Sequence, residues 1–227
     1  MILYIANKNY SSWSLRPWVL MRALGIDFEE RLVPFKASEN WEEFRKFSPS
    51  GKVPALVLPE ATLWDSLAII EYLYELHPSV WPNNQMARAW ARCASAEMHS
   101  GFSVLREFCS MSCGVRMKLL EPNKLLDKEL QRIDELWCEG LQRFGGDFLA
   151  GNSFTAVDAF FAPVVFRLQT YGLSLGERAG DYAQRMLAHP AMQQWYNEAL
   201  QETWRDDPHD EECLKYSRVT EDFRVLS

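Results

Sequence analysis

The segment GKVPALVLPEATLWDSLAIIEYLYEL, residues 51–76, holds three successive signals that decide the fold. ALVL and TLW are short apolar runs on either side of PEA, which predicts a β-hairpin. DSLAIIEYLYEL begins with an acidic residue and a serine, which are good helix caps, and its apolar residues recur at helical spacing. Val53-Pro54 directly precedes the first strand. Because proline cannot donate to a sheet ladder, this proline belongs at a strand start, and its peptide bond can be cis.

The residues before this segment alternate strand and helix signals. ILYIA (2–6) suits a buried strand, residues 14–24 have apolar positions at helical spacing, and FEERLVPF (28–35) is typical of a partly exposed strand. NWEEFRKF (40–47) predicts a short helix capped by Asn40. The predicted order is βαβαββα, which indicates a small α/β layer with partly parallel strand pairing.

After residue 76 the character of the chain changes. HPSVWPNN (77–84) is rich in proline and asparagine and predicts a linker. Beyond it strand signals vanish, and we expect helices over 85–108, 124–144, 156–171, 178–188 and 190–203. The chain is therefore expected to form an α/β domain over 1–78 and an all-helical domain over 85–205. The polar tail over 206–227 either packs as an extended arm or stays mobile.

Composition excludes several classes of protein. The 227 residues are 48% hydrophobic and 13% aromatic, which indicates a globular chain. The net charge of −7 argues against nucleic acid and anionic membranes as partners. The 5 cysteines form no C-x-x-C pair, no signal peptide is evident, and no apolar run is long enough to span a bilayer. We expect a cytoplasmic protein with reduced thiols and no metal site.

Two predicted helix starts carry hydroxyls beside free backbone amides. NYSSWSLRPWVL (9–20) places Ser11, Ser12 and Ser14 at the start of the first helix, where the positive end of the helix dipole attracts anions. Asp65 and Ser66 begin the helix after the hairpin and suit a ligand that bears both an ammonium and a carboxylate. The alternative for each is a structural cap, and the alternative for Pro54 is a plain strand-entry residue.

Four segments, in order, resemble cytosolic glutathione S-transferases: SSWSLRPW (11–18), GKVPAL (51–56), DSLAIIEYL (65–73) and FLAGNSFTAVDAFFAP (148–163). The first is similar to the zeta-like pattern S-S-C-S-x-R, with Trp13 in place of the cysteine. The resemblance implies a thioredoxin-like N-terminal domain that binds glutathione as co-substrate. It also implies an all-α, helical-bundle C-terminal domain that supplies the pocket for the second substrate.

The resemblance also implies roles for individual residues. Val53, beside cis-Pro54, would pair through its backbone with the cysteinyl part of glutathione, and Lys52 would reach a carboxylate. Asp65 and Ser66 would hold the γ-glutamyl end of the tripeptide. A serine of the first turn would donate a hydrogen bond to the sulfur.

The sulfur contact has a simple physical basis. A thiolate is the nucleophile, and a free thiol is mostly protonated at neutral pH, so a hydroxyl donor and a helix N-terminus favour the reactive form. We favour Ser11 for this role, with Ser12 second and Tyr10 as an outside candidate. Ser14 is expected to be a plain cap. Arg16 is expected to form a salt bridge or to anchor the helix end.

The helical half offers one structural motif and one set of pocket candidates. Ser153 or Thr155 with Asp158 predicts a capping-box-like arrangement, in which Asp158 supports stability rather than turnover. The second-substrate pocket is expected to be lined from the helix over 85–108 and the residues after it. The candidates are Met98, His99, Phe102, Phe108 and Met111.

The function that follows from the resemblance is that of an enzyme. It is expected to activate glutathione as a thiolate and to conjugate it to, or isomerise, a small hydrophobic electrophile. The alternative is a non-catalytic protein that binds glutathione or a partner on the same fold. The resemblance also implies a homodimer, and Trp64 and Tyr74 are candidate exposed aromatics near its interface.

Overall fold

The computed structural model describes residues 1–36 and 40–225. The part of the chain up to Leu76 has the predicted βαβαββα order. The elements are β1 (Ile2–Ile5), α1 (Ser12–Leu24), β2 (Glu29–Leu32), α2 (Trp41–Arg45), β3 (Ala55–Val57), β4 (Thr62–Trp64) and α3 (Ser66–Leu76). The strands form one sheet in the order β2-β1-β3-β4, in which β2 is parallel to β1 while β3 and β4 are antiparallel to their neighbours.

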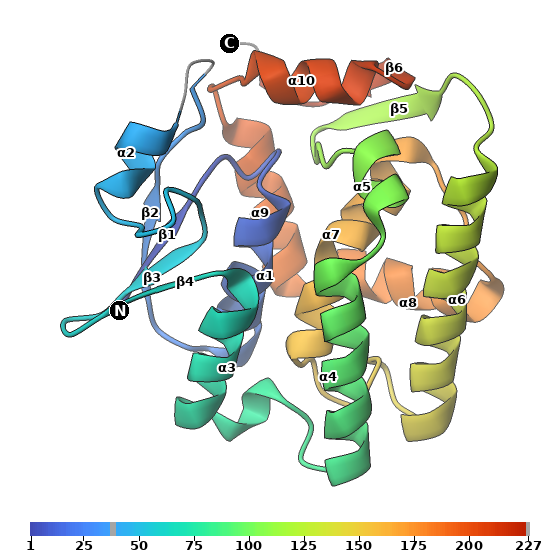
Figure 1. Cartoon of the computed structure of the whole chain (residues 1–227). Helices are drawn as coiled ribbons and strands as arrows, with labels where there is room; N and C mark the ends of the chain where they lie inside the picture. Colours follow the sequence, from blue (N-terminus) through green and yellow to red (C-terminus); the bar gives the residue numbers. More distant parts are fainter. Residues whose placement is uncertain (37–39, 226–227) are drawn as a thin grey trace.

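The rest of the chain, called here the helical half, is mostly helical (Figure 1). After the 3₁₀ turn η1 (Pro78–Val80) come α4 (Gln85–Ser100), α5 (Ser103–Phe108), β5 (Val115–Leu119), α6 (Lys124–Phe144), α7 (Ala156–Tyr171), α8 (Glu177–Ala188), α9 (Pro190–Gln201), α10 (Asp207–Leu214) and β6 (Ser217–Asp222). The predicted fold class, an α/β layer followed by a helical bundle, is confirmed. In the described part of the chain, no helix has the length and apolar character needed to cross a membrane.

The prediction of a single helix over 85–108 is wrong, because the first helix of this region ends at Ser100 and a second one follows. Gly101 ends α4, and Phe102 has a left-handed backbone conformation with φ of 55° while its side chain stays buried. The new direction places the start of α5 against Glu129 of α6. That carboxylate accepts hydrogen bonds from the backbone N–H groups of Val104 (3.2 Å) and Leu105 (2.7 Å).

The expectation that strands vanish after the linker is also wrong. β5 pairs with β6 in an antiparallel ribbon that joins residues 115–119 to the C-terminal segment. Figure 1 shows this ribbon beside α10 at one end of the molecule. The tail therefore packs, as a helix and a strand rather than as an extended arm. Local sequence could not predict the ribbon, because each strand finds its partner about a hundred residues away.

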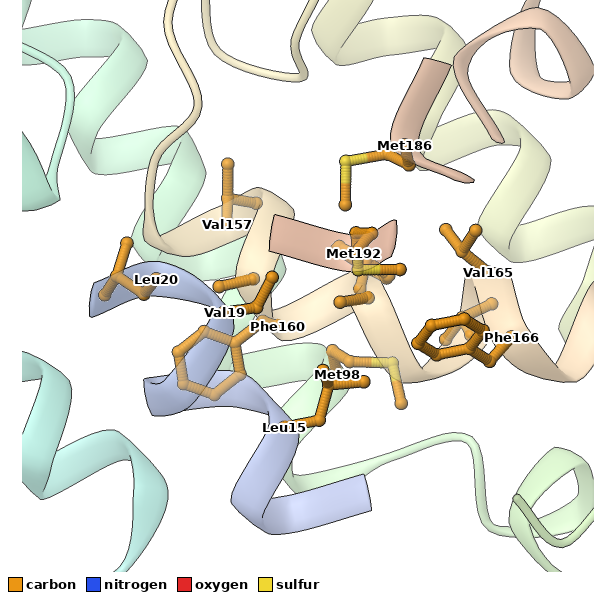
Figure 2. Close-up of a cluster of buried hydrophobic side chains, with 14 of the residues drawn as sticks. Leu15, Val19, Leu20, Met98, Val157, Phe160, Val165, Phe166, Met186 and Met192 are labelled. Atoms are coloured by element: carbon orange, nitrogen blue, oxygen red, sulfur yellow. The ribbon is translucent and has the colours of Figure 1, made fainter. Parts of the chain in front are cut away.

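One continuous core joins the two halves (Figure 2). Helix α1 packs on α7 and α9, so apolar side chains of the first half meet those of the second. Burial of such side chains is the dominant favourable contribution to folding. The labelled members of this cluster are Leu15, Val19, Leu20, Met98, Val157, Phe160, Val165, Phe166, Met186 and Met192.

A polar contact fixes the loop between β1 and α1. The carboxylate of Glu202, just after α9, accepts hydrogen bonds from the backbone N–H groups of Lys8 (2.5 Å) and Asn9 (3.2 Å). The indole N–H of Trp195 donates to the carbonyl of Lys8 at 2.9 Å. These groups are buried, so the helical half holds the residues that lead into the serine turn.

The predicted capping box is present at the start of α7, with Thr155 as the N-cap residue. Asp158 is buried and accepts hydrogen bonds from the N–H of Thr155 (2.9 Å), the N–H of Leu149 (3.0 Å) and the hydroxyl of Tyr182 (3.0 Å). Burial raises the pKa of Asp158 to about 6, against the opposing effect of these donors. This carboxylate ties the loop before α7 to α8.

Candidate active site

A two-part cleft lies where the sheet domain meets the helical half. Its first cavity, of about 410 Å³, is lined by Ser11, Ser12, Lys52 and Val53 among others. The second, of about 430 Å³, is lined by Trp13, Ser50, Lys52, Val53, Pro54, Trp64, Asp65 and Ser66. Trp13, Lys52 and Val53 line both cavities, so the two are continuous. The structure thus brings together every site residue predicted from the sequence.

The serine turn differs in detail from the prediction. Helix α1 begins at Ser12, two residues before the predicted start, so Ser14 lies inside the first turn and is not a cap. The N-cap residue is Ser11, whose side chain makes no capping bond. Instead the Ser11 hydroxyl donates to the Ser14 Oγ at 2.7 Å, and the N–H of Ala6 donates to the same oxygen at 3.4 Å.

The hydroxyls of Ser11 and Ser12 thus have different surroundings. Ser11 is buried and tied to Ser14, whereas Ser12 is half-buried and its hydroxyl has no protein partner in the described chain. Both residues line the first cavity at the N-terminal end of α1. An anion beside them would meet hydroxyl donors and the positive end of the helix dipole.

Tyr10 is unsuited to the role of an outside candidate for the sulfur contact. Its hydroxyl accepts a hydrogen bond from Nη1 of Arg224 at 3.0 Å, in the C-terminal segment. Burial raises the pKa of Tyr10 far above its usual value, and the carboxylate of Asp210 adds to this effect. The phenol is therefore held neutral and occupied, while its ring lines the cavity.

The Val53-Pro54 peptide bond is cis, and Pro54 is buried at the entry to β3. In the described residues Val53 makes no turn or loop hydrogen bond, and it lines both cavities. Its backbone is placed to pair with an extended ligand that lies along the cleft.

Asp65 and Ser66 form the other end of the cleft. Asp65, with φ of 73°, is the N-cap of α3, and its Oδ1 accepts from the N–H of Leu67 at 2.8 Å. Its other oxygen, Oδ2, lies 3.4 Å from Nε2 of His99. The hydroxyl of Ser66 is buried and has no hydrogen-bond partner in the described chain. Because buried polar groups are nearly always paired, this hydroxyl is available to a ligand.

Arg16 does not form the expected salt bridge. Its side chain is buried, and its Nε and Nη1 have no hydrogen-bond partner within the described residues. The guanidinium instead lies 4.1 Å from the ring centre of Trp13 and 5.2 Å from that of Phe160. Burial holds the pKa of Arg16 well below its usual value, and the neighbouring arginines lower it further. Trp13 thus separates a buried cation from the cleft, a favourable cation–π arrangement.

Comparison with known proteins identifies the family. The model for the glutathione S-transferase N-terminal domain matches residues 10–76, and that for the C-terminal domain matches residues 123–198, together well over half of the chain. This chain belongs to the glutathione S-transferase family. The predicted family and fold are therefore confirmed, while the role of the serines stays a prediction.

Individual relatives of this transferase are distant but cover most of its length. It is 26% identical over 212 residues to a probable maleylacetoacetate isomerase of Caenorhabditis elegans, with 83% of this chain and 92% of the relative covered. It is 28% identical over 197 residues to glutathione S-transferase GstA of Escherichia coli O157:H7, with coverages of 79% and 90%.

Solved structures share the fold of the transferase. A glutathione transferase homolog from Burkholderia, crystallised with bound glutathione, has a TM-score of 0.65 at 25% identity, with 87% of this chain and 96% of that chain covered. Maleyl pyruvate isomerase, described as a bacterial glutathione S-transferase in Zeta class, has a TM-score of 0.66 at 18% identity, with coverages of 88% and 98%.

The second-substrate pocket of the transferase differs from the prediction. Of the five predicted lining residues, only Met111 lines the first cavity. The break after α4 leaves Met98 in the core, and His99 turns toward Asp65. Burial lowers the pKa of His99, which favours its neutral form.

Sequence reasoning missed the four ionisable residues that line the first cavity from the helical part of the transferase: Arg106, Arg167, His209 and Glu212. Arg167 is buried, and its Nε donates to the carbonyl of Cys109 at 2.8 Å. Burial lowers the pKa of Arg167 to about 10, so it stays charged at neutral pH. Arg106 donates to the carbonyls of Met98 and His99. One signal was available, since Arg167 is the only basic residue of the apolar helix AVDAFFAPVVFRLQTY.

Proposed function

We propose that this glutathione S-transferase binds glutathione along the cleft, activates its thiol, and either conjugates it to or isomerises a small electrophile. The observation that carries the proposal is the cleft itself, in which a buried, unpartnered Ser66 hydroxyl and two serines at a helix N-terminus stand on either side of Val53. The Burkholderia homolog with bound glutathione and the relatives named as isomerases support it.

In this proposal the γ-glutamyl end of glutathione lies at the start of α3. Asp65 faces the ammonium, and the hydroxyl of Ser66 donates one hydrogen bond to the α-carboxylate. Val53 pairs with the cysteinyl part through its backbone, and Lys52 reaches a carboxylate. Each group lines the second cavity.

The thiol then lies by the serine turn, where we assign the sulfur contact to Ser11 and secondarily to Ser12. Ser14 supports Ser11, because the two hydroxyls are 2.7 Å apart and Ser14 also accepts from Ala6. When the Ser11 hydroxyl turns to the sulfur, the Ser14 hydroxyl can donate to Ser11 in its place. Such a chain of hydrogen bonds strengthens the terminal donor.

The electrophile is placed in the first cavity. Its walls include the aromatic rings of Trp13, Phe35 and Phe44 and the side chain of Met111, which suit a small apolar molecule. Arg106 and Arg167 line the same space, and guanidinium groups pair well with carboxylates. We therefore propose an apolar electrophile that carries a carboxylate.

The decisive experiment measures the ultraviolet absorbance of the glutathione thiolate against pH, with the protein in wild-type form and as Ser11→Ala and Ser12→Ala. Activation by Ser11 is supported if the pKa of the bound thiol lies below the free value of about 8.5 and moves back toward that value in Ser11→Ala. If only Ser12→Ala returns the thiol pKa toward the free value, the sulfur contact belongs to Ser12 instead. Binding without any shift favours the alternative of a non-catalytic glutathione carrier, and absence of binding refutes the proposal.

We further propose a cytoplasmic homodimer. The 5 cysteines are free thiols, which accords with a reducing compartment. Trp64 is half-exposed on β4 and Leu76 is half-exposed at the end of α3, and such apolar groups on one domain suit a subunit contact. Sedimentation of the wild type and of Trp64→Lys tests the dimer.

A further inference from the structure

The C-terminal segment brings a histidine–carboxylate pair into the cleft. Nδ1 of His209, on α10, is 2.5 Å from Oδ2 of Asp206, the N-cap residue of that helix. The Asp206 side chain is only 3% exposed, whereas that of His209 is 31% exposed. The imidazole lines the first cavity together with Ser11 and Ser12. It therefore faces the space assigned to the thiol and the electrophile.

Two aromatic rings hold this imidazole in place. Its centre is 5.3 Å from that of Tyr10 and 4.6 Å from that of Phe35, and the planes are tilted by only 23° and 27°. Tyr10 is itself tied to Arg224. Because the ring is stacked on both, it cannot rotate freely, and its contact with Asp206 is reinforced.

The Asp206 contact decides which ring nitrogen is available. A carboxylate can only accept, so Nδ1 of His209 carries the proton that points to Asp206. Nε2 is then the atom that exchanges a proton with a molecule in the cavity. This is the arrangement that orients histidine for acid–base catalysis.

Charged and titratable groups reach the imidazole from several elements. Arg106 and Arg167 line the same cavity, and Asp206 contacts Nδ1 of the ring. Arg224 is already paired with Asp210 at 2.9 Å and with Asp222 at 2.7 Å. The groups around the ring or on the same cavity are Tyr10, Lys52, Arg106, Arg167, Asp206, Asp210, Glu212 and Arg224.

We propose that His209 is a catalytic acid, positioned by Asp206, which protonates the carbanion formed when glutathione adds to an activated double bond. The inference rests on the proposed function, because it requires a glutathione thiolate in the same cleft. It also defines the class of electrophile, an α,β-unsaturated carbonyl compound.

The proton balance of the addition is complete. The sulfur lone pair forms a C–S bond to the β carbon, and the electron pair of the double bond moves toward the carbonyl to give an enolate. The Nε2 proton of the imidazolium then passes to the α carbon and leaves a neutral imidazole. That imidazole regains a proton from water or from the thiol of the next glutathione. The sum is the addition of S–H across the double bond.

Two probes separate this step from thiolate formation. Addition to benzylideneacetone ends with protonation at carbon, whereas substitution on chlorodinitrobenzene ends with loss of chloride and protonates no carbon. The wild type is compared with His209→Phe, which keeps the aromatic stack, and His209→Gln, which keeps a polar side chain. Asp206→Asn retains a good helix N-cap but alters the partner of Nδ1. Glu211→Gln, exposed on the same helix and outside the cleft, is the matched control.

We expect kcat for addition to fall about 100-fold in both His209 variants, the usual contribution of a positioned acid. The fold loss of kcat for substitution should be at least ten times smaller, that is, about 10-fold or less. Asp206→Asn should lose about 10-fold in addition. The pH profile of the addition rate should differ between the wild type and His209→Phe, because the variant has no ionisable side chain at this position. The thermal midpoint of each variant monitors folding.

The possible failures are distinguishable. If the wild type shows no thiolate shift and turns over neither probe, the proposed function fails. If the wild type has a shifted thiolate but His209→Phe loses both rates equally, loses neither, or keeps the wild-type pH profile, the role of His209 is refuted. Substitution without any addition in the wild type also refutes it.

Discussion

Nη1 of Arg224 donates to the hydroxyl of Tyr10 at 3.0 Å and so joins the C-terminal segment to the loop that leads into the serine turn. The two residues are far apart in sequence, and the same guanidinium binds Asp210 of α10. Arg224 is therefore one link between α10 and the cleft, beside the stacking of His209 on Tyr10 and Phe35. This link helps to hold His209 and Glu212 on the cavity wall.

Arg224→Gln should loosen this link. We expect the free energy of unfolding to fall by about 2 kcal/mol, because Asp210 and Tyr10 lose a charged partner in a partly buried site. A double-mutant cycle with Tyr10→Phe should give a coupling of about 1 kcal/mol. Chemical denaturation measures both values. Arg218→Gln, an exposed arginine on β6, is the control and should change stability by less than about 0.5 kcal/mol. Equal effects at positions 218 and 224 would contradict the link.

Ser14→Ala tests the support of the serine turn. The hydroxyl of Ser14 lies outside the cleft lining but is 2.7 Å from that of Ser11. Removal of this hydroxyl should raise the pKa of the bound glutathione thiol by less than about one unit, since a neutral hydrogen bond contributes about 1 kcal/mol. Ser11→Ala should raise it more. The thiolate absorbance measures both. A larger effect of Ser14→Ala than of Ser11→Ala would reverse the assigned order.

Arg167→Gln and Arg106→Gln test the charge of the electrophile. If a carboxylate lies between the two guanidiniums, each variant should raise KM for an electrophile with a carboxylate about ten-fold more than KM for its neutral methyl ester. The ratio of the two KM values removes any common effect of altered folding. Equal changes for acid and ester would show that the arginines serve the structure only, for example through the contact of Arg167 with the Cys109 carbonyl.

Local patterns were sufficient for the sheet domain and for one end of the cleft. Val53-Pro54 precedes a hairpin and Asp65 caps a helix, and both features depend on neighbours within a few residues. Alternating strand and helix signals predicted the element order for the same reason. The start of α1 was misplaced by two residues, and this changed Ser14 from a cap to a hydrogen-bond partner of Ser11.

The other wall of the cleft depends on distant contacts. β6 finds its partner in β5, and this pairing carries α10 and therefore His209 over the serine turn. Arg167 reaches the cavity only because α7 packs against the residue that ends α5. Neither placement is encoded in local spacing, so sequence reasoning found half of the site and missed its cationic and histidine-bearing half.

A substitution at Asp158 tests whether this residue supports the stability of the fold and takes no part in turnover. Asp158→Asn keeps the size of the side chain but replaces one carboxylate oxygen by an NH2 group, which cannot accept. Either the donors to Oδ1, Leu149 and Tyr182, or the donors to Oδ2, the N–H and hydroxyl of Thr155, then lose their acceptor. Loss of a buried network of this kind should lower the free energy of unfolding by about 3 kcal/mol. At a temperature where the variant stays folded, kcat and KM should be those of the wild type.

The pH dependence of the same variant has a defined sign. The pKa of Asp158 is raised to about 6 in the folded chain, above its usual 3.8. The folded protein thus binds the proton more tightly than the unfolded chain, so its contribution to stability is full below the lower value and is lost as pH rises through about 6. The amide side chain of the variant cannot titrate. The wild-type free energy of unfolding, minus that of Asp158→Asn, should therefore decrease between about pH 4 and 6 and level off above. Denaturant titrations across this range measure the difference, and a difference that grew with pH would mean that the four hydrogen-bond donors outweigh burial.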